Sequence, residues 1–131
     1  MKINHLGIAV KSIEQAMEAY RKLFPDLEAE MEPMKEGASM KMMMIKTETG
    51  TLLELLEPID PEGDIGRFIA KRGEGIHHIA YEVDDIYAAY EDAKNKGMRV
   101  LGGIVRGAGG YNTFFIHPKD VYGVLTEFVS L

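Results

Sequence analysis

Two histidines and two glutamates recur at matched spacing in this sequence. His5 and His78 each lie in a similar stretch, NHLGIAV and HHIAYEV, and they are 73 residues apart. Glu54 and Glu127 each follow the histidine of their own half by 49 residues. Imidazole and carboxylate groups together suit Co²⁺, Mn²⁺, Ni²⁺, Zn²⁺ or Fe²⁺ and leave positions for water or substrate. The matched set therefore predicts a divalent metal site built from these four residues.

Each of these residues taken alone has an ordinary structural explanation. A histidine on a strand is more often a hydrogen-bonded structural residue than a ligand, and a glutamate on a strand usually faces water. Strand alternation argues against the wet face here, because each glutamate shares its face with two aliphatic residues: Leu52 and Leu56 for Glu54, and Leu125 and Val129 for Glu127. Burying an unpaired carboxylate costs several kcal/mol, so both glutamates need a cation or strong donors.

The first half of the chain predicts one helix and four strands. Residues 3–10 alternate as a strand, with His5 on one face and Leu6 on the other. Ser12 stands three residues before Gln15, which is the spacing of a capping box, and the helical pattern that follows stops at Pro25. Extended stretches follow at about residues 27–34, 38–46 and 51–57.

The second half repeats this order with a shift of 73 residues. Ile79, Tyr81 and Val83 share one strand face, Asp85 caps a helix, and Gly97 ends it. Extended segments are expected near residues 98–106, 112–117 and 123–129. Both halves therefore predict the order β-α-β-β-β.

The repeat predicts an α+β fold in which residues 1–131 form a single domain. Each half is too small to bury its own sheet face, so the repeats, at about residues 1–57 and 75–131, must share a core. The segment between them is a crossover with a short helical run that includes Ile65 and Phe68. If the halves pair about a pseudo-twofold axis, the first and last strands of each repeat bring the four candidate ligands together in a concave sheet.

Composition excludes several classes of function. The 131 residues contain no cysteine, so disulfides, thiolate ligands and a cysteine nucleophile are absent. The net charge of −6, without a cluster of Lys and Arg, argues against a nucleic-acid partner. No stretch is long and apolar enough to span a bilayer, and the first ten residues do not resemble a signal peptide. We therefore expect a cytoplasmic protein with no membrane partner.

Four longer stretches resemble one known family. NHLGIAVKSIEQA, LELLEP, RGEGIHHIAYEVDDI and HPKDVYGVLTEF are similar to the methylmalonyl-CoA epimerases of the vicinal oxygen chelate superfamily, and the resemblance covers essentially the whole chain. It implies paired βαβββ modules that form a cupped, mostly antiparallel sheet around a divalent ion, often Co²⁺. By motif, the ligands of that family fall on His5, Glu54, His78 and Glu127.

The resemblance also implies an activity. Members interconvert the (R) and (S) epimers of methylmalonyl-CoA, a small-molecule acyl-CoA substrate, by moving a proton at the carbon between the thioester and the carboxylate. Glu127 is the expected catalytic residue as both ligand and base. Some relatives have a second glutamate three residues after a glycine that corresponds to Gly37, where this chain has Met40. Glu36, water or another group is then the second acid or base. Family analogy also implies a homodimer.

Two alternatives share the fold. A glyoxalase I-like isomerase, or lactoylglutathione lyase, uses a similar four-ligand site, and a non-catalytic small-molecule-binding protein needs no metal. The RGEGIHHIA and HPKD stretches favour the epimerase over the first, and the paired His and Glu residues favour an enzyme over the second.

Other residues have weaker claims to function. His77 is one residue off the repeat register, and His117 precedes a proline at a strand end, so structural roles are expected for both. The MKMMMI run is expected in a core strand. The GAGG stretch at 107–110 is expected to be a flexible loop that closes over substrate. Partners for the CoA phosphates remain open among four cations: Lys41, Arg72, Arg106 and Lys119.

Overall fold

The structure is a computed structural model that describes residues 1–107 and 110–131, and it divides into two compact units. One unit contains Leu6–His77, and the other contains Met1–His5 and His78–Leu131. The boundary falls inside two strands, β1 (Lys2–Ala9) and β5 (Gly75–Glu82). The predicted loop at 107–110 includes positions 108 and 109, which lie outside the described residues. The description of residues 1–131 as one domain of two repeats stays a prediction.

The first half has the predicted order of elements. After β1 come α1 (Ile13–Leu23), β2 (Glu28–Met31), β3 (Met40–Lys46) and β4 (Leu52–Pro58). Helix α1 begins where the capping box predicts, because the Ser12 side chain accepts a hydrogen bond from the Gln15 backbone N–H at 3.2 Å. Strand β2 ends earlier than predicted. The Glu32 N–H still bonds to the Met42 carbonyl, and Pro33, the next residue, has no N–H with which to continue the strand ladder.

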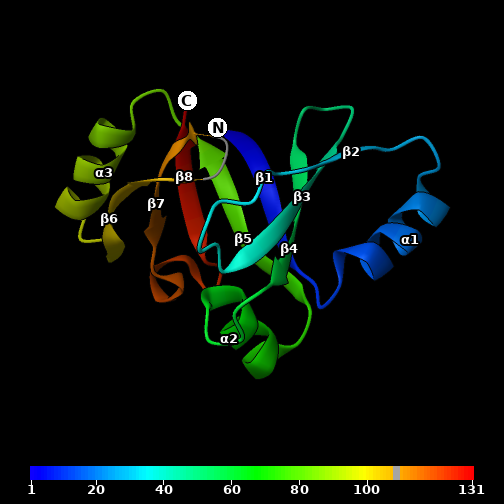
Figure 1. Cartoon of the computed structure of the whole chain (residues 1–131). Helices are drawn as coiled ribbons and strands as arrows, with labels where there is room; N and C mark the ends of the chain where they lie inside the picture. Colours follow the sequence, from blue (N-terminus) through cyan, green and yellow to red (C-terminus); the bar gives the residue numbers. More distant parts are fainter. Residues whose placement is uncertain (108–109) are drawn as a thin grey trace. The chain divides into compact units, whose positions relative to one another are not determined.

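In the Leu6–His77 unit, the strand order is β2-β3-β4-β1, and the β2–β3 and β3–β4 pairs are antiparallel. Adjacent residues of β4 point to opposite faces, and Leu55 and Leu56 are 0% and 1% exposed. Leu55 packs in a cluster with Ile13 and Met17 of α1, while Leu56 packs with Ile65 of α2 (Asp64–Arg72). Strand β4 is therefore buried on both faces. Both helices can be followed in Figure 1.

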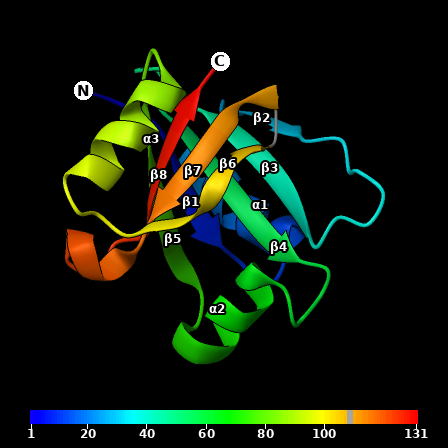
Figure 2. The same cartoon turned by 90° about the vertical axis from the view of Figure 1, so that its left-hand side faces the viewer.

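In the other unit, the strand order is β1-β5-β8-β7-β6, and the β5–β8 pair is parallel. Its remaining elements are α3 (Ile86–Asn95), β6 (Val100–Arg106), β7 (Asn112–Ile116) and β8 (Thr126–Ser130). Helix α3 lies beside β8 in Figures 1 and 2, and its Ile86 packs with Phe114 and Ile116. The predicted cap is confirmed, because Asp85 Oδ1 accepts hydrogen bonds from two backbone N–H groups at 3.0 and 3.1 Å.

These elements confirm the α+β class and the repeated βαβββ order. One element was not predicted: a 3-10 helix, η2 (Pro118–Val121), occupies the β7–β8 connection and delays the start of β8 to Thr126. None of the helices in the described part of the chain is long and apolar enough to cross a membrane.

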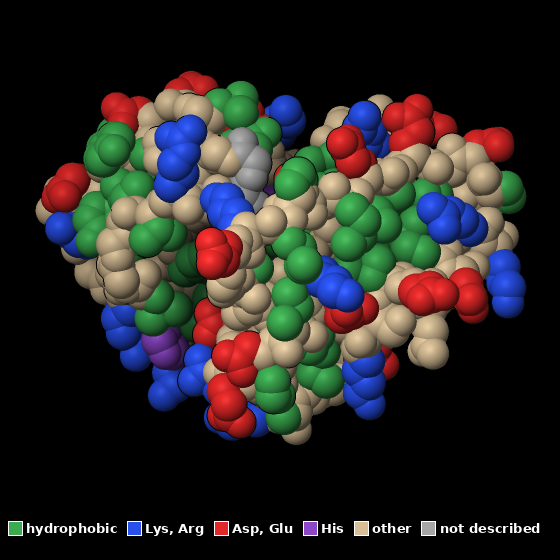
Figure 3. Space-filling view, viewed as in Figure 1, with side chains coloured by type: hydrophobic (Ala, Val, Ile, Leu, Met, Phe, Trp, Pro, Cys, Tyr) green, Lys and Arg blue, Asp and Glu red, His purple; other side chains and the backbone are tan. Residues whose placement is uncertain are grey.

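Hydrophobic side chains are unevenly distributed on the surface of the Leu6–His77 unit. Figure 3 shows such side chains gathered over the region of α1, β2 and β3. Four large exposed hydrophobic residues belong to or follow these elements: Leu23, Phe24, Met31 and Met34. Hydrophobic side chains that gather on one face are typical of surfaces that contact another molecule.

Candidate metal centre

The register of two parallel strands places His78 and Glu127 on the same sheet face. Ala80 of β5 is the partner of Glu127 of β8, and His78 lies two residues before Ala80. Residues two apart on a strand share a face, so His78 and Glu127 both point away from the face that α3 covers. Phe128, which follows Glu127, packs with the residues beneath α3 instead.

Three ligand atoms meet at this point. The Nε2 atoms of His5 and His78 are 3.0 Å apart. Glu127 Oε2 lies 3.2 Å from His5 Nε2 and 3.0 Å from His78 Nε2. All three residues are buried, with 6%, 5% and 8% of their surfaces exposed. Three atoms that can each hold a metal ion therefore form a nearly equilateral triangle in a buried site.

The far side of His5 is held by a side chain that the sequence analysis did not select. Asn4 Nδ2 lies 3.3 Å from Glu82 Oε2, so the amide N–H donates to that carboxylate. The amide oxygen is then left to accept a hydrogen bond from His5 Nδ1 at 2.7 Å. In the neutral imidazole this arrangement places the proton on Nδ1 and a lone pair on Nε2. Metal-binding histidines commonly have such a partner on the second ring nitrogen.

The triangle needs positive charge. A neutral His5 aims its Nε2 lone pair at a carboxylate oxygen 3.2 Å away, and this contact is repulsive unless a cation or an added proton is present. Burial raises the pKa of the Glu127 carboxyl, but when the two rings carry the added proton, their hydrogen bonds and positive charge outweigh that effect and hold the pKa at about 2. Glu127 is therefore an anion at neutral pH, and its surroundings favour a cation.

The dimensions of the triangle fit a divalent ion. Bonds of about 2.1 Å to one ion place neighbouring ligand atoms about 3.0 to 3.4 Å apart. The three observed separations of 3.0, 3.0 and 3.2 Å lie in this range. The nitrogen and oxygen donors match the ions predicted from the sequence.

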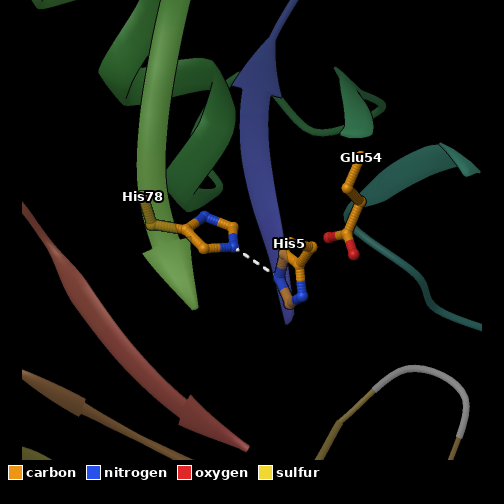
Figure 4. A group of neighbouring side chains, drawn as sticks. All are labelled: His5, Glu54 and His78. Carbon is orange, nitrogen blue, oxygen red and sulfur yellow. Dashed lines mark hydrogen bonds between the residues drawn. The ribbon is translucent and has the colours of Figure 1, made fainter. Parts of the chain in front are cut away.

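Glu54 is the fourth residue of the predicted set. It lies on β4 opposite Met44 of β3 and is 7% exposed, as strand alternation predicts for a residue on an apolar face. His5, Glu54 and His78 each offer one ligand atom, and these atoms all lie within 4.8 Å of one another. Figure 4 shows these three side chains, with the His5–His78 contact as a dashed line.

Thr113 of β7 is a buried polar residue that the sequence analysis missed. Its hydroxyl donates a hydrogen bond to Glu127 Oε1 at 2.7 Å, and only 4% of the residue is exposed. One signal in the sequence could have found it, because Thr113 is a polar residue in the mostly apolar strand NTFFI. It lies two residues from Phe115, which pairs with Glu127, so Thr113 and Glu127 share a sheet face. Glu127 thus has a different partner on each oxygen.

The two other histidines have structural contacts, as expected. The His77 ring packs edge-on against Phe68 of α2, with ring centroids 4.9 Å apart. His117 Nδ1 accepts a hydrogen bond from the Lys119 backbone N–H at 3.0 Å and caps η2. Neither contact requires a ligand.

Met40 and Glu36 were considered in connection with the second proton-transfer group, and the structure shows the surroundings of each. Met40 packs with Leu56 and Ile65, and its thioether cannot carry a proton. Glu36 lies in an exposed turn before β3. Gly37 permits this turn, because its φ of +75° lies in the left-handed region that turns use and strands do not.

Among the cations considered for the CoA phosphates, Lys41 has a carboxylate partner. Its Nζ lies 3.5 Å from Glu57 Oε2. Arg72, Arg106 and Lys119 are exposed. An exposed cation is also what solubility requires, so these positions do not by themselves locate a nucleotide site.

The chain belongs to the glyoxalase/bleomycin resistance protein/dioxygenase superfamily, whose family model matches residues 4–115. Its relatives include the ethylmalonyl-CoA/methylmalonyl-CoA epimerase of Cereibacter sphaeroides, which is 41% identical over 96% of this chain and 95% of that protein. The mitochondrial methylmalonyl-CoA epimerase of Homo sapiens is 38% identical over 96% of this chain and 72% of that protein.

A solved structure gives the same relationship in three dimensions. A variant of Streptomyces coelicolor methylmalonyl-CoA epimerase, in complex with 2-nitronate-propionyl-CoA, is 37% identical to this chain and matches with a TM-score of 0.88. The match covers 99% of this chain and 96% of that chain. The predicted fold and the predicted resemblance to methylmalonyl-CoA epimerases are both confirmed.

Proposed function

We propose that this protein is a metal-dependent epimerase that interconverts (R)- and (S)-methylmalonyl-CoA. The observation that carries the proposal is the triangle of His5, His78 and Glu127, in a chain whose relatives at 38% and 41% identity are named for this reaction. The triangle alone also suits a glyoxalase I-like enzyme. The names of the relatives favour the epimerase.

In this proposal, His5, Glu54, His78 and Glu127 hold the divalent ion. Their donor atoms are two imidazole nitrogens and two carboxylate oxygens, a set that would leave positions for water or substrate. We propose Co²⁺ as the native ion, as the resemblance to the epimerases implies, and borderline nitrogen donors would suit it; Mn²⁺, Ni²⁺, Zn²⁺ and Fe²⁺ are the alternatives. When bound, such an ion stabilises the negative charge that develops on the thioester oxygen of the substrate.

Glu127 moves one proton in the proposed reaction. Its carboxylate is ionised at neutral pH, so it can accept a proton from the carbon between thioester and carboxylate. Coordination to a cation would lower the basicity of this carboxylate, so the reaction depends on a substrate proton made more acidic by the neighbouring positive charge. His5 and His78 orient the carboxylate through Oε2.

Inversion needs a second proton donor or acceptor on the opposite side of the reacting carbon. Met40 has no titratable group, and Glu36 is exposed in a turn. We propose that water fills this role. Water would donate a proton to the opposite side of the carbon, and Glu127 would then release its own proton to the hydroxide that remains, so solvent hydrogen enters the product in each turnover.

One experiment tests the proposed function. The protein loaded with Co²⁺ is incubated in D₂O with (R)- or (S)-methylmalonyl-CoA, and epimer conversion and deuterium at the 2-carbon are followed by NMR. Conversion of each epimer with deuterium incorporation, abolished by a chelator and restored by Co²⁺, is expected. Absence of both conversion and exchange with either epimer would rule out the epimerase. A parallel assay with a glutathione hemithioacetal tests the glyoxalase I-like alternative.

The remaining expectations are proposals about the protein in its cell. We propose a homodimer, and the exposed hydrophobic residues Leu23, Phe24, Met31 and Met34 supply apolar surface that a partner chain would cover. Light scattering after size-exclusion chromatography measures the mass directly. The cytoplasmic location stays a prediction, as does the absence of a membrane partner.

A further inference from the structure

We propose that Thr113 is a positioning residue for Glu127. Its hydroxyl holds Oε1 of the carboxylate so that Oε2 faces the two imidazoles. This inference rests on the proposed function, in which Glu127 is both a metal ligand and the group that moves a proton.

The sheet register brings the two side chains together. On the β7–β8 ladder, Thr113 pairs with Val129 and Phe115 pairs with Glu127, so Thr113 and Glu127 are diagonal neighbours on one face. The hydroxyl lies 2.7 Å from Glu127 Oε1. Since an ionised carboxylate is only an acceptor, the threonine hydroxyl must be the donor. A hydroxyl–carboxylate bond of this length is charge-assisted and stronger than a bond between neutral groups.

Each oxygen of Glu127 then has a defined role. Oε2 lies 3.0 to 3.2 Å from the two imidazole nitrogens, and Oε1 lies against Thr113. The terminal torsion of a glutamate is soft and has few preferred values. Without the hydroxyl, the carboxylate is free to rotate and to bind an ion through both oxygens. With the hydroxyl, one oxygen binds the ion, and Oε1 keeps a lone pair that can take a proton.

A buried threonine hydroxyl does not require a carboxylate as its hydrogen-bond partner. Thr126, on β8, is 6% exposed, and its hydroxyl donates to the Val124 carbonyl at 3.0 Å. The chain therefore satisfies a buried threonine hydroxyl with backbone where no special contact is required. Thr113 instead uses the carboxylate of a candidate ligand, and Thr126 supplies the matched control.

The test compares Thr113→Val, which removes the hydroxyl with little change of shape, with Thr113→Ser, which keeps it, and with Thr126→Val. In Thr113→Val we expect kcat to fall by about 10- to 100-fold with KM nearly unchanged, the size of effect seen when outer partners of metal ligands are removed. Thr113→Ser and Thr126→Val should stay within about threefold of wild type, well below that outer-partner effect.

Two readouts do not depend on activity. The visible absorption of the Co²⁺ protein should change in Thr113→Val, because the carboxylate changes its mode of coordination, and not in Thr113→Ser. In the metal-free protein, the ¹³C signal of the Glu127 carboxylate should shift in Thr113→Val only. A Thr113→Val protein with wild-type kcat, Co²⁺ spectrum and ¹³C signal would overturn the inference. If wild type itself does not epimerise, the proposed function fails, while the two spectra still test the role of Thr113.

Discussion

The Nε2 atoms of His5 and His78 lie 3.0 Å apart, although 73 residues separate the two histidines along the chain. Each histidine belongs to the first strand of its own half, β1 or β5. Equivalent positions of the two repeats therefore meet through their ring nitrogens. This contact ties the duplication in the sequence to the candidate site. Three predictions follow from the surroundings of the pair, and a fourth concerns the separate contact between Arg99 and Asp120.

Replacing His78 with alanine should remove metal and activity together. The substitution deletes one corner of the ligand triangle, and we expect metal affinity to fall by more than about 100-fold, beyond the loss for an outer partner. Titration calorimetry with Co²⁺ measures the affinity, and the D₂O assay measures activity. His117→Ala is the control, because His117 caps η2 and is not one of the candidate ligands. Tight Co²⁺ binding by His78→Ala would mean that the ion binds elsewhere.

Replacing Asn4 with alanine should weaken metal binding by about tenfold through His5. The amide oxygen of Asn4 accepts from His5 Nδ1 and so keeps a lone pair on Nε2. Without this acceptor the ring can adopt the other tautomer, which presents an N–H to the ion. Nitrogen-15 NMR of the imidazoles reports the tautomer. Asn95→Ala, at the end of α3, is the control, and an unchanged His5 tautomer in Asn4→Ala would contradict this explanation.

Replacing Glu127 with glutamine should slow proton transfer more than it weakens metal binding. The amide keeps an oxygen that can bind an ion but cannot accept the substrate proton. Removing a general base typically costs about 10² to 10⁴ in rate. The rate of deuterium exchange at the 2-carbon checks the effect, with Glu91→Gln on α3 as the control. Full activity in Glu127→Gln would show that another group is the base.

Acid should weaken the contact between Arg99 and Asp120. The Arg99 side chain and backbone N–H donate to Asp120 and hold the pKa of its carboxyl at about 2, below the usual 3.8. Because the folded pKa is lowered, the stabilisation is complete above pH 4 and is lost as the pH falls toward 2. An NMR titration of Asp120 measures the midpoint, and Arg99→Gln should return it toward 3.8. A midpoint near 3.8 in wild type would contradict the contact.

Helix-capping residues and hydrophobic periodicity predicted most of the helices and strands, because both are strong local signals in the sequence. Ser12 and Asp85 begin their helices where the sequence places them. Strand parity predicted that Glu54 and Glu127 are buried, and both are less than a tenth exposed. The roles of the four candidate ligands stay predictions that metal titration will test.

Alternation was a poor guide where a side chain reaches around its own strand or where a turn intervenes. Asn4 is adjacent to His5, so parity assigns it to the opposite face, yet its amide oxygen contacts the His5 ring. The contact between Thr113 and Glu127 could be predicted only by knowing that β7 and β8 are neighbouring strands, and that pairing exists only in the folded sheet. The start of β8 was also placed too early, because Tyr122 adopts a left-handed conformation, with φ of 57°, after η2.

The register between β5 and β8 also constrains how this protein can evolve. Glu127 and Phe128 point to opposite faces, so the loss of a single residue inside β8 would turn the carboxylate toward α3 and the phenyl ring toward the histidines. Length changes should therefore survive in the connection before β8 and be eliminated within the strand. Selection against an unstable fold then also keeps the side chain of residue 127 on the face of the histidines, because a shifted strand would bury a carboxylate beneath α3.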